Sequence, residues 1–172
     1  KILKAIAPNL EKNFASPMFC THPDSIVTLS VKKEDEDKIY RRQYKMPESL
    51  RNGTREIIKR WFQEGKLVKA PKGCKYSTPL LVVPKFDKDG IITGLRVCTD
   101  VRQLNKYLIE DDKFEIPYIP DVLSAFKGAK LFGEFDLKEA FNQFKVAEES
   151  QPLTAFTFEG EQYMFQGCPY GI

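Results

Sequence analysis

A pair of apolar runs on either side of an Asp-Gly turn places the strongest constraint on how this chain can fold. The first run is LLVV at residues 80–83, and the second is LRVCTDV at residues 95–101. Asp89-Gly90, which lies between them, is a dipeptide typical of the turns that close β-hairpins. The pattern therefore predicts a buried strand and a returning antiparallel strand, which share a loop that contains Lys85, Lys88 and Arg96.

Helical and strand patterns extend on both sides of this hairpin. Apolar residues recur at helical spacing from about residue 47, and Gly65 stands where such a helix would end. A second helix is predicted to end near Gly128, and LTAFTF and QYMFQG predict two strands joined by the turn EGE. The run KLFGEFD at residues 130–136 predicts a further strand, followed by a short helix. At 172 residues and 42% hydrophobic, the chain can form one core or two small lobes.

Charge is distributed unevenly along the chain. Nine Lys/Arg face three Asp/Glu between Lys66 and Lys106, a balance of +6, although the whole chain carries only +3. Between Glu134 and Gln162 two Lys face seven Asp/Glu, a balance of −5. A basic segment followed by an acidic one suits a protein that binds an anionic partner in one part and metal cations in another. Two solvated faces of uneven charge would give the same pattern.

Cysteine usage and hydropathy exclude some classes of protein. The four cysteines lie far apart, at Cys20, Cys74, Cys98 and Cys168, and His22 is the only histidine, so the usual spacing of a zinc site is absent. Reduced thiols fit an intracellular protein. No apolar run approaches the ~20 residues of a membrane-spanning helix, so no membrane partner is expected. Because the chain begins with Lys1, we expect it to be a segment of a longer polypeptide.

Asp136 is the candidate for chemistry, because it follows the predicted strand directly. A carboxylate close to a core costs free energy unless something pairs with it. At the edge of a domain it would be held rigidly enough to bind a metal ion, and hard oxygen ligands favour Mg²⁺ or Mn²⁺. Asp136 would also suit the N-cap of the helix that follows, and composition alone favours that interpretation.

Six stretches in series decide between these interpretations. They are STPLLVVPK, LRVCTDVRQLN, IPYIPDVL, FDLKEAFNQF, TAFTF and YMFQGCPYGI. In this order and at this spacing they closely resemble the reverse transcriptases of Gypsy-type long-terminal-repeat retrotransposons. The resemblance is strong from about residue 44 to residue 172 and faint before that. It implies an α+β fold, the reverse-transcriptase-like right hand, of which this chain would form the fingers and part of the palm.

The resemblance implies roles for four residues of the fingers. Arg96 matches the arginine that contacts the triphosphate of the incoming nucleotide, and Lys85 resembles the lysine that closes over its γ-phosphate. Fixed cations there would stabilise the charge that develops on the phosphoryl oxygens. Asp100 and Arg102 would orient the fingers and the template strand, or form a structural ion pair.

The resemblance also assigns the beginning of the palm. Asp136 matches the first catalytic aspartate, a ligand of two Mg²⁺ ions (or Mn²⁺), and Leu137 would offer its backbone carbonyl to a metal. Phe141 matches the steric gate, whose ring excludes a ribose 2′-hydroxyl; a core aromatic is the alternative. Tyr170 would line the nucleotide site. Tyr170 and Cys168 replace the Phe and Met usual in the family, which affects fine selectivity rather than class.

The predicted organisation has three parts. Residues 1–43 form an N-terminal connector, residues 44–128 the fingers region, and residues 129–172 the start of the palm. The family's Tyr-x-Asp-Asp turn, which carries the remaining catalytic aspartates, would lie beyond Ile172. We therefore expect the isolated segment to be inactive.

The function expected is RNA-directed DNA synthesis as part of a retrotransposon polyprotein. The expected partners are an RNA/DNA primer-template, deoxynucleoside triphosphates and the rest of the polyprotein, namely palm, thumb and ribonuclease H. The alternative is a domesticated remnant that binds nucleic acid or acts as a scaffold without catalysis. The expected localisation is intracellular, in the cytoplasm, in virus-like particles or in the nucleus.

Overall fold

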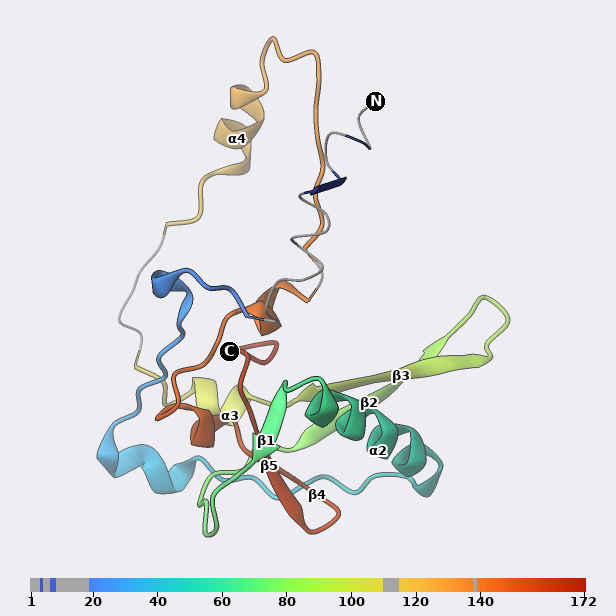
Figure 1. Cartoon of the computed structure of the whole chain (residues 1–172), viewed down its shortest axis with the longest axis vertical. Coiled ribbons are helices and arrows are strands. Elements are labelled where there is room, and N and C mark those ends of the chain that lie inside the picture. The colour runs from blue at the N-terminus through green and yellow to red at the C-terminus, as the bar shows by residue number, and fades with distance from the viewer. Residues whose placement is uncertain (1–3, 5–6, 9–18, 110–114, 138) are drawn as a thin grey trace.

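The computed structural model describes residues 4, 7–8, 19–109, 115–137 and 139–172 (Figure 1). Helices and antiparallel strands are mixed along the chain, as the predicted α+β class requires. The 3-10 helices are η1 (Pro23–Ser25), η2 (Lys33–Lys38), η3 (Ala140–Gln143) and η4 (Gln151–Thr154). The α-helices are α2 (Glu48–Gln63), α3 (Arg102–Asn105) and α4 (Ile119–Ala125). The strands are β1 (Leu67–Lys69), β2 (Leu80–Phe86), β3 (Ile92–Thr99), β4 (Phe156–Phe158) and β5 (Glu161–Phe165).

The predicted hairpin is present as the antiparallel pair β2–β3, which extends away from the rest of the molecule (Figure 1). Gly90 in its turn has a φ of 77°, a backbone conformation that glycine adopts without the cost of a Cβ. The first strand is buried on one face only, since Leu80 is buried whereas Leu81 and Val83 are exposed. Pro84 does not end this strand, because in a two-stranded ribbon its missing N–H can face solvent.

A three-stranded antiparallel sheet with the order β1-β5-β4 forms the second layer. The hairpin β4–β5 was predicted, and Glu159 and Gly160 in its turn both have positive φ. β1 was not predicted as a strand. It pairs with β5 in the register Leu67↔Phe165, which joins a segment of the predicted fingers to a segment of the predicted palm.

Two clusters of buried side chains form the core. One lies between the three-stranded sheet, α2 and the base of the hairpin, and Phe156, which is 0% exposed, packs in it against the rings of Tyr163 and Phe165. The other lies under α3 and contains Leu104, Val146 and Cys168. Cys98 is only partly buried, whereas Cys168 is buried.

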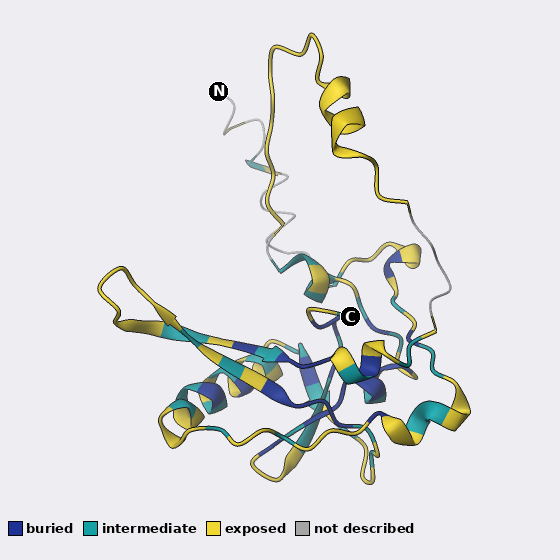
Figure 2. Ribbon diagram, turned by 180° about the vertical axis from the view of Figure 1, so that it is seen from behind, coloured by how far each residue is buried: buried dark blue, intermediate teal, exposed yellow. Residues whose placement is uncertain are grey.

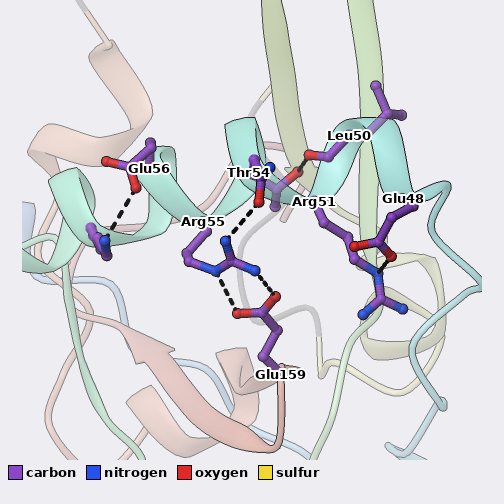
Figure 3. Close-up of polar contacts among 9 residues, drawn as sticks. Glu48, Leu50, Arg51, Thr54, Arg55, Glu56 and Glu159 are labelled. Carbon is purple, nitrogen blue, oxygen red and sulfur yellow. Dashed lines mark hydrogen bonds and ion pairs between the residues drawn. The ribbon is translucent and has the colours of Figure 1, made fainter.

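A bidentate ion pair, shown in Figure 3, connects helix α2 to the turn between β4 and β5. The guanidinium of Arg55 donates to both carboxylate oxygens of Glu159, at 2.8 and 2.6 Å, and to the side chain of Asn52. On its inner face the helix buries Thr54 and Ile58. Gly65, with a φ of 73°, follows its end as predicted. None of the described helices combines the length and apolar character needed to cross a bilayer.

An exposed arm, residues 115–137, extends away from both sheets and contains α4 (Figures 1 and 2). The strand predicted at residues 130–136 is absent, and Leu131 and Phe135 are 92% and 93% exposed. A strand forms only when its backbone groups find a partner edge, and no described strand lies beside this segment. The short helix predicted after it is reduced to η3, because Glu139 has a φ of 51°, which an α-helix does not allow.

We expect Phe156→Ala to lower the free energy of unfolding by about 3–5 kcal/mol, because it removes a fully buried ring and leaves a cavity in the sheet core. Ile91→Ala, at an exposed residue of the hairpin turn, should change it by less than about 0.5 kcal/mol. Urea unfolding followed by tryptophan fluorescence measures both. Equal effects of the two substitutions would contradict the assignment of this core.

Candidate functional site

The two cations in the strands of the hairpin, Lys85 and Arg96, lie on one of its faces. Arg96 is directly opposite Val83, and Lys85 is opposite Gly94. Because side chains alternate along a strand, Lys85 and Val83 point to the same side, and Arg96 points there too. Both cations are exposed, whereas Val97 on the other face is buried in the core. Lys85 and Arg96 thus lie within the strands rather than in the loop between them.

Asp100 and Arg102 form an ion pair at the end of β3. The guanidinium donates from Nε and from one terminal nitrogen to the two carboxylate oxygens, each at 2.7 Å. The hydroxyl of Tyr44 also donates to Asp100, at 2.7 Å. Arg102 holds the pKa of the buried Asp100 carboxyl well below its usual range, against the opposing effect of burial. The structural ion pair is therefore present, and the Arg102 side chain is still 83% exposed.

A polar cavity of about 240 Å³ adjoins this ion pair. It is lined by Arg41, Tyr44, Asp100, Arg102 and Gln103. Arg41 donates to the side-chain oxygen of Gln103 at 3.1 Å. With both oxygens of Asp100 engaged, the cavity keeps a net positive charge, which suits a phosphate.

Asp136 is exposed and lies in the arm, next to the exposed side chain of Leu137. It does not cap a helix, because the first described helical residue after it is Ala140 and the N-cap is Glu139. Among the described residues, no group of three or more His, Cys, Asp or Glu is placed to hold a metal ion. The carboxylate of Asp136 is a hard oxygen donor of the kind that Mg²⁺ or Mn²⁺ prefers. The described part of the chain does not place a complete set of metal ligands around it.

Phe141 and Tyr170, far apart in the sequence, come together in the structure. Their ring centroids are 5.5 Å apart, and the planes are tilted by 61°, a favourable edge-to-face arrangement. Phe141 is 49% exposed and Tyr170 is 48% exposed, so neither ring is a core side chain in this structure.

The η3 turn (residues 139–144) holds Phe141 at this position. The amide of Asn142 donates to the carbonyl of Glu139, and that of Phe144 to the carbonyl of Phe141. Glu139 has left-handed backbone dihedrals, which cost a residue with a Cβ about 1–2 kcal/mol. The Cys168 amide donates to Phe144, which connects the turn to the segment that ends in Tyr170.

A small cavity of about 60 Å³ lies between this turn and β3. Val97, Cys98 and Thr99 of β3 line it on one side, and Glu139, Asn142 and Tyr170 on the other, with Trp61, Lys66, Phe165 and Pro169 completing the wall. Tyr170 therefore lies beside the strand that contains Arg96, and Phe141 packs against Tyr170.

Comparison with known proteins identifies the family. The family model described as reverse transcriptase (RNA-dependent DNA polymerase) matches residues 83–172, which is more than half of the chain. The chain belongs to the reverse transcriptase family. The matched range includes the hairpin cations, the Asp100–Arg102 pair, Asp136 and the two aromatic rings.

The similar curated proteins include retrovirus-related Pol polyproteins of Drosophila melanogaster. That of transposon opus is 27% identical over 172 residues, which is 100% of this chain and 17% of the relative. That of transposon 412 is 31% identical over 81% of this chain and 11% of the relative, and that of transposon gypsy is 28% identical over 87% and 14%. These matches confirm the predicted resemblance to Gypsy-type reverse transcriptases. The chain spans less than a fifth of the length of each relative.

Two solved structures support the predicted fold. The foamy viral protease-reverse transcriptase in complex with double-stranded DNA matches with a TM-score of 0.57 and 24% identity, over 86% of this chain and 23% of that one. The native protease-reverse transcriptase of prototype foamy virus matches with a TM-score of 0.60 and 25% identity, over 77% and 17%. The right-hand polymerase fold is thereby confirmed. The boundaries at residues 43 and 128 stay predictions.

Several residues of the site were not predicted from the sequence. Arg41, Tyr44 and Gln103 surround the Asp100–Arg102 pair, and Lys66 contacts the η3 turn. The dense run of cations and tyrosines at residues 40–45 was a usable signal for the first group. Nothing in the sequence distinguishes Lys66 from the other lysines of the basic segment.

The stability of the domain should depend on pH through Asp100. Because its pKa is lowered in the folded state, its contribution is complete above the unfolded value of about 3.9 and is lost as the pH falls below it. We expect Asp100→Asn to be less stable near neutral pH and to lose less stability than the parent on acidification below about pH 4. Chemical unfolding at a series of pH values measures this. Asp89→Asn, in the exposed hairpin turn, should keep the parent's slope, and an equal slope for Asp100→Asn would refute the assignment.

Proposed function

We propose that this chain is the fingers and first part of the palm of an RNA-directed DNA polymerase encoded in a retrotransposon polyprotein. The observation that carries the proposal is that Phe141 packs against Tyr170, and that Tyr170 borders a small cavity together with β3, the strand that contains Arg96. Segments from three separate motifs are thus brought close together, and the two rings are half-exposed.

In this proposal the incoming deoxynucleotide binds between the hairpin and the aromatic pair. Arg96 and Lys85, exposed on one face of β2–β3, neutralise the triphosphate. Phe141 lies against the sugar and excludes a 2′-hydroxyl, while Tyr170 supports the Phe141 ring from behind and borders the base. The exposed side of Arg102 and the cavity beside it contact phosphates of the template.

Asp136, with the carbonyl of Leu137, would hold divalent metal ions, Mg²⁺ or Mn²⁺. Bound there, such ions would supply charge stabilisation at the phosphoryl group and activation of the primer 3′-hydroxyl, in a two-metal arrangement. One exposed carboxylate is a partial ligand set, so the remaining ligands would come from other parts of the polyprotein. The polymerase would act on an RNA/DNA primer-template, and the remainder of the polyprotein would supply the rest of the palm, the thumb and a ribonuclease H domain.

The test is primer extension on an RNA template by the polymerase that includes this chain and the palm residues that follow it in its reading frame. Asp136→Asn should reduce extension by at least about a hundredfold, because losing a carboxylate ligand removes several kcal/mol of charge stabilisation. Primer–template binding should stay within about twofold. Glu134→Gln, two residues away in the same exposed arm, is the matched control and should remain active. Primer extension by Asp136→Asn at the parent's rate would contradict the proposal.

Arg96→Ala should lower kcat/KM for deoxynucleotides by about a hundredfold, since it removes a fixed cation from the triphosphate. The affinity for primer–template should not change. Lys88→Ala removes a cation from the turn of the same hairpin and should have little effect on kcat/KM. If Arg96→Ala instead binds the template poorly but incorporates deoxynucleotides normally once bound, Arg96 contacts the template and not the triphosphate.

A further inference from the structure

Lys66 connects the two halves of the site. It lies between α2 and β1, and its backbone is fixed on both sides. Its amide donates to the carbonyl of Trp61 at 2.9 Å, and its carbonyl accepts from the amide of Gln166 at 2.9 Å. Its side chain is only 14% exposed, so contacts with the protein around the α2–β1 junction determine where it lies.

The ammonium group of Lys66 binds two carboxylates. Nζ is 2.7 Å from Oε2 of Glu139 and 2.8 Å from Oε2 of Glu64. Burial works to lower the pKa of Lys66, but the hydrogen bonds and charges of the two carboxylates outweigh it and raise the pKa. Lys66 is therefore a fixed cation whose partner across the cavity is Glu139.

Glu139 is the residue through which this contact reaches the aromatic pair. It is the N-cap of η3, its carbonyl accepts the hydrogen bond that closes the turn, and Phe141 follows two residues later. Its left-handed backbone is a conformation that surrounding contacts must hold in place. The ion pair to Lys66 is such a contact, and it comes from a residue whose backbone is hydrogen-bonded on both sides.

Backbone hydrogen bonds from the amide of Cys20 to Gln143 and from the amide of Cys168 to Phe144 hold the far end of the turn. Glu139, at its start, instead borders the cavity. Lys66 and Glu139 both line it, together with Thr99, whose hydroxyl is buried without a hydrogen-bond partner among the described residues. A space of about 60 Å³ is large enough to admit water beside Glu139 if the ion pair is lost, and we expect the start of the turn to shift in that case. Such a shift would move Phe141 relative to β3.

We propose that the Lys66–Glu139 ion pair is a positioning device for Phe141, and that it sets how strictly the site rejects ribonucleotides. This inference rests on the proposed function of Phe141 as the sugar gate. In this proposal Lys66 and Glu139 are positioning residues. They act through the backbone of the η3 turn, so that the rigid α2–β1 junction fixes the space beneath the sugar.

The test measures the ratio of ribonucleotide to deoxynucleotide kcat/KM in the polymerase that includes the downstream palm. Lys66→Met keeps an unbranched stem of similar length but removes the charge, and Glu139→Gly removes the carboxylate while it permits the positive φ. Each should raise the ratio by about fivefold, because a displaced ring discriminates less well. Lys66→Arg keeps the charge and should restore most of the discrimination.

A second Lys–Glu ion pair on the same sheet provides the matched control. Lys69 of β1 contacts Glu161 of β5, away from the η3 turn. Lys69→Met should leave the ratio unchanged. A general loss of stability would act on both pairs alike and would lower activity toward both sugars, whereas a positioning role changes the ratio at Lys66 and Glu139 alone.

Phe141→Ala separates this inference from the proposed function. If Phe141→Ala raises the ratio by about tenfold while Lys66→Met and Glu139→Gly leave it within about twofold of the parent, the positioning role is wrong and the gate stands. If Phe141→Ala also leaves the ratio unchanged in an active enzyme, the gate and the inference both fail. A parent polymerase that extends no primer would overturn the proposed function and this inference with it. If Lys66→Met folds poorly, Glu139→Gly decides the outcome.

Discussion

The pairing of β1 with β5 is the contact on which the geometry of the site depends. It aligns Leu67 with Phe165 and thereby fixes the start of β1 beside the end of the β4–β5 hairpin. The carbonyl of Lys66 accepts from Gln166 as an extension of the same ladder. From Gln166 the chain continues to Tyr170, and Lys66 contacts Glu139 in the η3 turn that contains Phe141. The positions of both aromatic rings therefore depend on the β1–β5 pair. Burial of Phe156 and Phe165 beneath this sheet stabilises the arrangement.

Sequence reasoning succeeded where local chemistry decides the structure. The β2–β3 hairpin follows from an Asp-Gly turn between apolar runs, and α2 follows from its apolar spacing and from Gly65 at its end. It failed for residues 130–136, whose apolar run suggested a buried strand, because a strand requires a partner that a sequence pattern does not show. β1 was missed because three residues give too short a pattern. The Lys66–Glu139 contact joins residues of ordinary surface type that are far apart in the chain, so no local signal could predict it.

The site combines rigid and exposed parts in a way that suits a large, charged ligand. Its anchoring groups are buried, as with Asp100 and the stem of Lys66, whereas the groups that face outward, such as Arg96, Arg102 and Phe141, are exposed. An exposed charged side chain such as Arg102 is kept in one orientation by a buried partner, here Asp100, and still faces solvent. The resemblance to reverse transcriptases implied roles for Asp100 and Phe141, and the structure adds the contacts that hold them: Tyr44 for Asp100 and Tyr170 for Phe141. It also adds the contact of Lys66 with Glu139, a residue to which sequence reasoning assigned no role.

The long separation between β1 and β5 has a consequence for how the protein is made. About ninety residues lie between Lys69 and its partner Tyr163. At a synthesis rate of ~5–20 residues per second, β1 emerges from the ribosome roughly 5 to 20 s before β5. The β2–β3 hairpin and α2 depend on nearby residues and can form during that interval, but the core around Phe156 cannot close. The nascent chain therefore exposes apolar surface for seconds, a period in which chaperones bind, and the two halves of the site meet only after nearly all of this segment has been synthesised.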